Sequence, residues 1–143
     1  MGVSLLLITH DDIGSSLLNA ATKMMGVSPI TSKNLIITPQ MDIEQGYVQA
    51  NQLCSELNDN DDILIVTDIY GSTPSNIATR LLEHTSNQQR IIVTGINLPM
   101  LVKIMNYAHL NLTELARKAC SGASDSIFIV DSSPTIDDSI DCH

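Results

Sequence analysis

The chain has 143 residues and a formal charge of −9 at pH 7, from 16 acidic and 7 basic side chains. That charge, with one Phe, three Tyr and no Trp, argues against a nucleic-acid ligand, because phosphate contacts need a basic face and base stacking needs aromatic rings. The length suits one domain, and no apolar run reaches the roughly 18–20 residues of a membrane span. The three cysteines are scattered and form no CxxC pair, which favours a reducing cytoplasm over a disulfide framework or a zinc site.

Short apolar runs alternate along the chain with longer amphipathic segments. From the amino terminus, the periodicity predicts a strand at Val3–Thr9, a helix at Ile13–Met25, a strand at Asn34–Thr38, a helix at Asp42–Leu57, a strand at Asp61–Thr67, a helix at Pro74–Glu83, a strand at Arg90–Thr94, helices at Pro99–Ala108 and Leu112–Ser121, and a short strand at Ser126–Val130. We interpret the first apolar run as a buried strand and not as a signal peptide, because no basic residue precedes it.

This alternation predicts an α/β fold with a doubly wound, mainly parallel sheet that is covered on both faces. We expect four parallel strands in the order 2-1-3-4, with the last short strand at an edge. The domain should span residues 1–130, and the acidic segment 131–143 should form a flexible tail. In such sheets ligands bind beyond the carboxyl ends of the strands, near the point where the strand order reverses.

Polar side chains follow the first and third predicted strands. His10 follows the first strand and Asp68 follows the third, so the two residues face each other if these strands are neighbours. A carboxylate that accepts a hydrogen bond from one ring nitrogen fixes the tautomer of a histidine and leaves the other nitrogen as a nucleophile. A histidine taken alone more often serves only to satisfy a nearby carbonyl, but the placement of His10 opposite Asp68 favours the nucleophile.

A second polar segment, Gly71-Ser72-Thr73-Pro74, follows Asp68. Thr73 is a good helix N-cap and Pro74 suits the first helical position. Gly71 allows the backbone to come close to a ligand. A helix N-terminus with a nearby hydroxyl binds anions. GSTP is also a common turn and cap, and its position beside His10 and Asp68 is what favours phosphate binding.

Three segments, LLLITHDDIGSSLLNAA, ILIVTDIYGSTPSNIA and VTGINLPML, resemble the mannose-type IIA component of the bacterial phosphotransferase system (PTS), and the similarity extends over about residues 3–130. The resemblance implies that His10 accepts a phosphoryl group from the phosphocarrier HPr and passes it to a IIB component for sugar uptake. Asp68 would orient the ring, and Gly71, Ser72 and Thr73 would bind the phosphate through backbone amides and the Thr73 hydroxyl.

The resemblance implies no cofactor or metal, contact with the membrane only through transporter subunits, and a homodimer. In that dimer the last strand, here Ser126–Val130, is exchanged between subunits and added antiparallel to the sheet edge. Two residues depart from the family pattern, because Asp11 follows the histidine where glycine is frequent and Ser72 replaces the second glycine of a GGSP motif.

Other interpretations fit part of the sequence. A receiver domain would use Asp11 and Asp12 after the first strand, a phosphoacceptor Asp68, the hydroxyl of Thr94 and a bridging magnesium ion. It also needs a lysine after the fifth strand, which IFIVDSSP lacks. A PTS-related regulatory protein without sugar transport and a non-catalytic binding module are the remaining alternatives. The other histidines are scattered without ligand spacing, so we expect no metal site.

Overall fold

The computed structural model describes residues 2–83 and 87–132, so most of the predicted tail at 131–143 lies outside the described residues. The elements run in the order β1 (Val3–His10), α1 (Ile13–Met25), β2 (Ser32–Ile37), α2 (Ile43–Ser55), β3 (Asp62–Thr67), α3 (Thr73–Leu81), β4 (Arg90–Thr94), α4 (Leu98–Asn106) and α5 (Leu112–Ser124). In the described part of the chain, no helix is long and apolar enough to cross a membrane.

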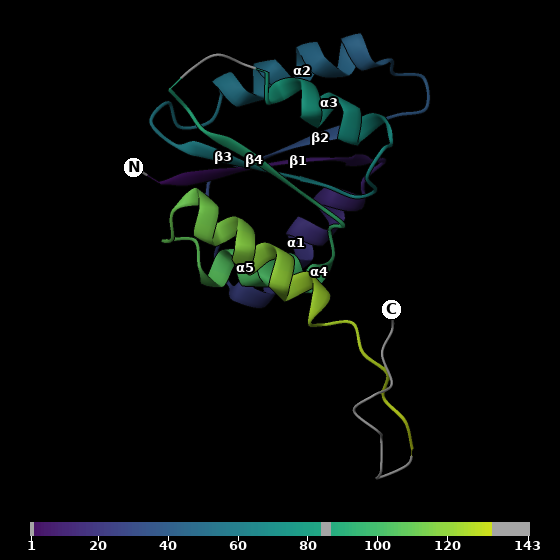
Figure 1. Ribbon diagram of the computed structural model, residues 1–143, viewed down its shortest axis with the longest axis vertical. Coiled ribbons are helices and arrows are strands. Elements are labelled where there is room, and N and C mark those ends of the chain that lie inside the picture. The colour runs from purple at the N-terminus through teal and green to yellow at the C-terminus, as the bar shows by residue number, and fades with distance from the viewer. Residues whose placement is uncertain (1, 84–86, 133–143) are drawn as a thin grey trace.

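The four strands form one parallel sheet in the order β2-β1-β3-β4, as the sequence predicts. The register places Ile8 of β1 opposite Thr67 of β3, and His10 opposite Ile37 of β2. The strand order reverses between β1 and β3, because the chain leaves β1 for a helix on one face and leaves β3 for a helix on the other (Figure 1). The carboxyl ends of β1 and β3 therefore define the switch point.

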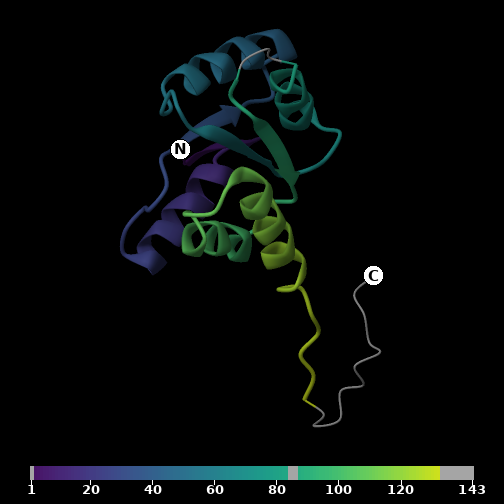
Figure 2. The same cartoon turned by 60° about the vertical axis from the view of Figure 1, so that its left-hand side comes forward.

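Helices cover both faces of the sheet, and the structure has three layers. Helices α2 and α3 lie on one face, and α1, α4 and α5 lie on the other (Figures 1 and 2). Successive residues of β1 point into opposite layers, since Leu5 and Leu7 belong to the core under α1, α4 and α5, whereas Leu6 and Ile8 belong to the core under α2 and α3. This two-sided burial explains why the strands read as continuous apolar runs.

Side-chain caps determine where several helices begin. Asp42 accepts a hydrogen bond from the backbone of Gln45, whose side chain accepts in return from the Asp42 backbone. Asn97 and Asn111 cap α4 and α5 with one bond each, in which the side chain accepts from the backbone N–H three residues later. These short polar side chains satisfy N–H groups that have no partner within the helix.

Helices α2 and α3 approach each other closely at one glycine. A Cβ atom at Gly46 of α2 would overlap Cδ1 of Ile77 in α3, and Ile77 is fully buried. Glycine is disfavoured in the interior of a helix, so its presence here reflects the need for α2 to pack tightly against α3.

The end of the described chain differs from a regular strand. Helix α5 ends at Ser124, and residues 127–130 have no regular secondary structure in the single chain. Ile127, Phe128 and Val130 are 61%, 68% and 80% exposed. A strand that pairs with a second subunit requires that subunit, so the exchanged strand at Ser126–Val130 stays a prediction.

Candidate functional site

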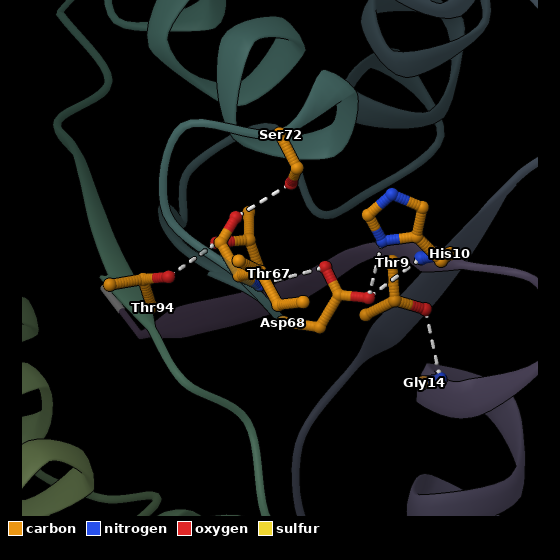
Figure 3. Close-up of polar contacts among 8 residues, drawn as sticks. Thr9, His10, Gly14, Thr67, Asp68, Ser72 and Thr94 are labelled. Atoms are coloured by element: carbon orange, nitrogen blue, oxygen red, sulfur yellow. Dashed lines mark hydrogen bonds and ion pairs between the residues drawn. The ribbon is translucent and has the colours of Figure 1, made fainter.

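His10 and Asp68 meet at the carboxyl ends of β1 and β3, where the sheet reverses its order. Oδ2 of Asp68 accepts a hydrogen bond from the backbone N–H of His10 at 2.9 Å and lies 2.8 Å from the ring Nδ1. Its other oxygen, Oδ1, accepts from the N–H of Ile69 at 2.9 Å (Figure 3). The carboxylate is thus held by the strand end that carries the histidine and by the loop that follows its own strand.

The environment keeps Asp68 ionised. Its side chain is only 8% exposed, and this burial opposes the charged form, but hydrogen bonds from the backbone and ring of His10 and from Ile69 outweigh burial and hold the pKa of Asp68 below its ordinary value. An ionised carboxylate only accepts hydrogen bonds, so Nδ1 of His10 is the donor and carries the ring proton.

The second ring nitrogen of His10 is available for chemistry. In a neutral imidazole with its proton on Nδ1, the lone pair is on Nε2. The His10 side chain is 43% exposed, and its outer nitrogen points away from Asp68 (Figure 3). The pair therefore presents at the surface a ring nitrogen that can act as an oriented nucleophile.

Helix α3 begins beside this pair, one residue earlier than predicted. Ser72, and not Thr73, occupies the N-cap, because Ser72 has extended backbone angles (φ −86°, ψ 176°) while Thr73 is already helical. Gly71, with φ +85°, turns the chain into the helix. The first helix-type hydrogen bond runs from the N–H of Asn76 to the carbonyl of Ser72.

The first turn of α3 leaves backbone donors open. Pro74 has no N–H, and the N–H groups of Thr73 and Ser75 have no hydrogen-bond partner among the described residues. These groups carry the partial positive charge of a helix N-terminus. Thr73 and His10 line the same pocket of about 220 Å³, so the open end of the helix and the nucleophile face common space. Such an arrangement suits an anion held beside the histidine.

The backbone conformation at Asp11 explains why glycine is frequent at this position and why aspartate is tolerated there. Its backbone lies in the left-handed region with φ +48°, and its N–H donates to the carbonyl of Ile37. Glycine enters that region freely, and aspartate is one of the few other residues that tolerate it. Asp11 also lines the pocket of about 220 Å³ with His10 and Thr73, and its exposure lets water weaken the repulsion between its carboxylate and a bound anion.

The polar groups of a receiver-type site do not converge. Within residues 2–83 and 87–132, no three His, Cys, Asp or Glu side chains come together in a way that could hold a metal ion. The hydroxyl of Thr94 pairs with that of Thr67 at 3.1 Å, whereas Asp68 is occupied by His10 and Ile69. The arrangement supports a histidine nucleophile over a phosphorylated aspartate.

Sequence reasoning missed three exposed apolar side chains that lie close to His10 and Asp68 in the chain. Ile69 and Tyr70, which directly follow Asp68, are 63% and 81% exposed, and Ile13 at the start of α1 is 42% exposed. We call Ile13, Ile69 and Tyr70 the apolar rim. Large apolar side chains exposed beside a reactive group are typical of a protein docking surface. The short interval Ile69-Tyr70 carries no periodicity, so only its exposure identifies it.

The chain matches the model of a known protein family and is similar to solved structures. A model of the family of PTS system fructose IIA components (EIIA-man) matches residues 4–120. A solved mannose/sorbose-specific IIA subunit from Enterococcus faecalis is 21% identical, with a TM-score of 0.82 over 95% of this chain and 100% of that one. A PTS IIA protein associated with the fucose utilization operon of Streptococcus pneumoniae is 25% identical, with a TM-score of 0.72 over 90% and 93%.

Proposed function

The chain belongs to the family of PTS system fructose IIA components, so its general role is that of a sugar phosphotransferase component. We propose that His10 is the residue that carries the phosphoryl group. The donor is phospho-HPr and the acceptor is a IIB component, which serves sugar uptake or its regulation. The observation that carries the proposal is the 2.8 Å pairing of His10 Nδ1 with Asp68, which leaves the outer ring nitrogen exposed.

The transfer is an in-line displacement at phosphorus. The lone pair of His10 Nε2 forms the new bond to phosphorus, while the bond between phosphorus and the donor atom of HPr breaks and its electron pair remains on the donor. The proton on Nδ1 stays between the ring and Asp68, so the ring gains positive charge next to an ionised carboxylate. Phosphoryl transfer needs mainly positioning and charge stabilisation, and Asp68 supplies both for the nucleophile.

The phosphoryl oxygens are held by the start of α3. Gly71 turns the chain so that the backbone N–H groups of Ser72 and Thr73 face the transferred group, and the Thr73 hydroxyl adds a further donor. The pocket shared by Thr73 and His10 supports this role. On a protein with a net charge of −9, the attraction for phosphate must be local, and helix-end N–H groups provide it.

The partners dock on the surface around His10 in the cytoplasm. The apolar rim supplies the contact area, and the exposed carboxylates of Asp11 and Asp12 match a partner with a basic face. The protein acts as a homodimer, in which Ser126–Val130 of each subunit pairs with β4 of the other. The exposure of Phe128 and the position of β4 at the sheet edge support this exchange.

Incubation with phosphoenolpyruvate, enzyme I and HPr tests the function. The chain should take up one phosphoryl group, and His10→Ala should abolish the uptake, whereas His109→Ala, which changes another exposed histidine, should leave it intact. The linkage should be labile in acid and stable in alkali. A linkage that is labile in alkali would indicate an acyl phosphate on Asp68, and full labelling of His10→Ala would refute the assignment.

A further inference from the structure

The side chain of Ser72 occupies the N-cap of α3 without capping the helix. Serine at this position normally accepts a hydrogen bond from the backbone of the first turn, but no such bond forms here. The Ser72 hydroxyl instead donates to the carbonyl oxygen of Ile69 at 2.6 Å. The hydroxyl therefore restrains the loop before the helix and leaves the helix end open.

Ile69 connects this hydroxyl to the carboxylate that orients the histidine. Its carbonyl accepts from Ser72 at 2.6 Å, and its N–H donates to Asp68 Oδ1 at 2.9 Å. The opposite oxygen of Asp68 lies 2.8 Å from His10 Nδ1. The backbone of Ile69 thus joins two hydrogen bonds that link the Ser72 hydroxyl to the Asp68 carboxylate and, through it, to the ring. Figure 3 labels the Ser72, Asp68 and His10 ends of this path.

Little else holds this loop in place. The side chains of Ile69 and Tyr70 are 63% and 81% exposed, so packing restrains them weakly. Gly71 has φ +85°, and a Cβ atom built on it would meet nothing within 4 Å. The short bond from Ser72 spans this segment and fixes one end of Ile69 while Asp68 fixes the other.

We propose that Ser72 is a positioning residue for phosphoryl acceptance, whose hydroxyl holds Ile69 so that Asp68 keeps the ring proton of His10 on Nδ1. The inference rests on the phosphocarrier function proposed above. A glycine at this position, as in the GGSP pattern that the sequence resembles, has no hydroxyl to make the bond. The device is therefore a property of this chain and separate from the backbone amide of Ser72.

Three substitutions and one matched control test the role of the hydroxyl. Ser72→Ala and Ser72→Gly remove it, and Ser72→Thr keeps it. Ser55→Ala is the control, because the exposed Ser55 hydroxyl also donates to a carbonyl three residues earlier, that of Gln52, at 2.6 Å, but lies at the end of α2, away from Asp68. Circular dichroism verifies that each variant is folded.

Two measurements distinguish positioning from other roles. The kcat of phosphoryl acceptance from phospho-HPr should fall about three- to tenfold in Ser72→Ala and Ser72→Gly with an unchanged KM, which corresponds to one ordinary hydrogen bond. NMR of ¹⁵N-labelled histidine should show a larger share of the His10 tautomer protonated on Nε2. Ser72→Thr should restore both quantities, and Ser55→Ala should change neither.

Several results would overturn the proposal. An unchanged kcat and ring spectrum in Ser72→Gly would mean that the hydroxyl positions nothing. A change in KM alone would place it in partner docking, and a slower kcat with an unchanged ring spectrum would place it on the phosphoryl group. The ring spectrum requires no phosphoryl donor, so a wild-type protein that HPr fails to phosphorylate would refute the function while the spectra still decide whether Ser72 positions His10.

Discussion

Replacement of Asp68 by asparagine removes the charge that stabilises the His10 ring and nearly conserves the shape of the side chain. The carboxylate accepts from the backbone and ring of His10 and from the N–H of Ile69. An asparagine has one oxygen and one amino group at these positions. With its amino group toward Ile69, the asparagine sets two donors against each other. With its amino group toward His10, it opposes the backbone N–H of His10 and forces the ring proton onto Nε2.

The magnitude follows from the bond that changes during the reaction. The Nδ1–Asp68 hydrogen bond strengthens when the ring becomes cationic, and one bond to a charged group contributes about 1.5–3 kcal/mol. Its loss should slow phosphoryl acceptance roughly 10- to 150-fold, because 1.36 kcal/mol corresponds to a factor of ten. Relocation of the proton to Nε2 would slow the reaction further, since the nucleophilic lone pair is then lost.

The assay is single-turnover transfer of ³²P from phospho-HPr, measured by rapid quench. Asp61→Asn is a matched control, because Asp61 also accepts hydrogen bonds from a backbone N–H and from neighbouring side chains and also has a lowered pKa, but it precedes β3 at the opposite end of the sheet. Asp61→Asn should transfer at the wild-type rate. Transfer by Asp68→Asn at the wild-type rate would refute the orienting role of Asp68.

Four further predictions concern pH-dependent stability, helix packing, assembly and partner docking. The pKa of Asp68 lies below its ordinary value of 3.8, so ionised Asp68 contributes its full stabilisation at pH values above 3.8. The difference in urea stability between wild type and Asp68→Asn should therefore shrink as the pH falls through the pKa of the folded state, and a constant difference would contradict this. Gly46→Ala should lower the free energy of unfolding by about 1–3 kcal/mol through overpacking against Ile77, and Ile77→Val, which lacks the Cδ1 atom, should reduce that loss in a double-mutant cycle. Phe128→Asp should prevent the proposed homodimer from forming, so that the variant is a monomer in light scattering, whereas a monomeric wild type would exclude strand exchange. The KM for phospho-HPr should rise with added salt and with Asp11→Asn if a basic face meets this acidic surface; a KM that does not respond to salt would contradict that model of docking.

Much of the architecture can be predicted from local sequence. The apolar runs at Val3–Thr9 and Asp61–Thr67 predict buried parallel strands, because a strand covered on both faces needs apolar residues at consecutive positions. In a parallel sheet the carboxyl ends of the strands share one edge, so His10 and Asp68 can be assigned to the same region without coordinates. The family resemblance adds their expected roles.

Local sequence could not provide the geometry that orients the site. Whether Asp68 reaches the ring of His10 depends on β1 and β3 being neighbours, and this pairing is a long-range contact. The N-cap was predicted at Thr73 and lies at Ser72, because both residue types permit the N-cap conformation and the backbone angles decide where α3 begins. The same holds for Asp11, whose positive φ arises from the turn that follows β1.

Hydrophobic periodicity and chain connectivity, which are local properties, were therefore enough to predict the α/β class and to single out His10 and Asp68 as candidates. Which nitrogen of His10 is free, how Asp68 is held and what the Ser72 hydroxyl contacts could be read only from the folded chain. Those features are set by hydrogen bonds between segments that are distant in the chain or lack any periodic pattern, and such bonds form only when the sheet brings the segments together.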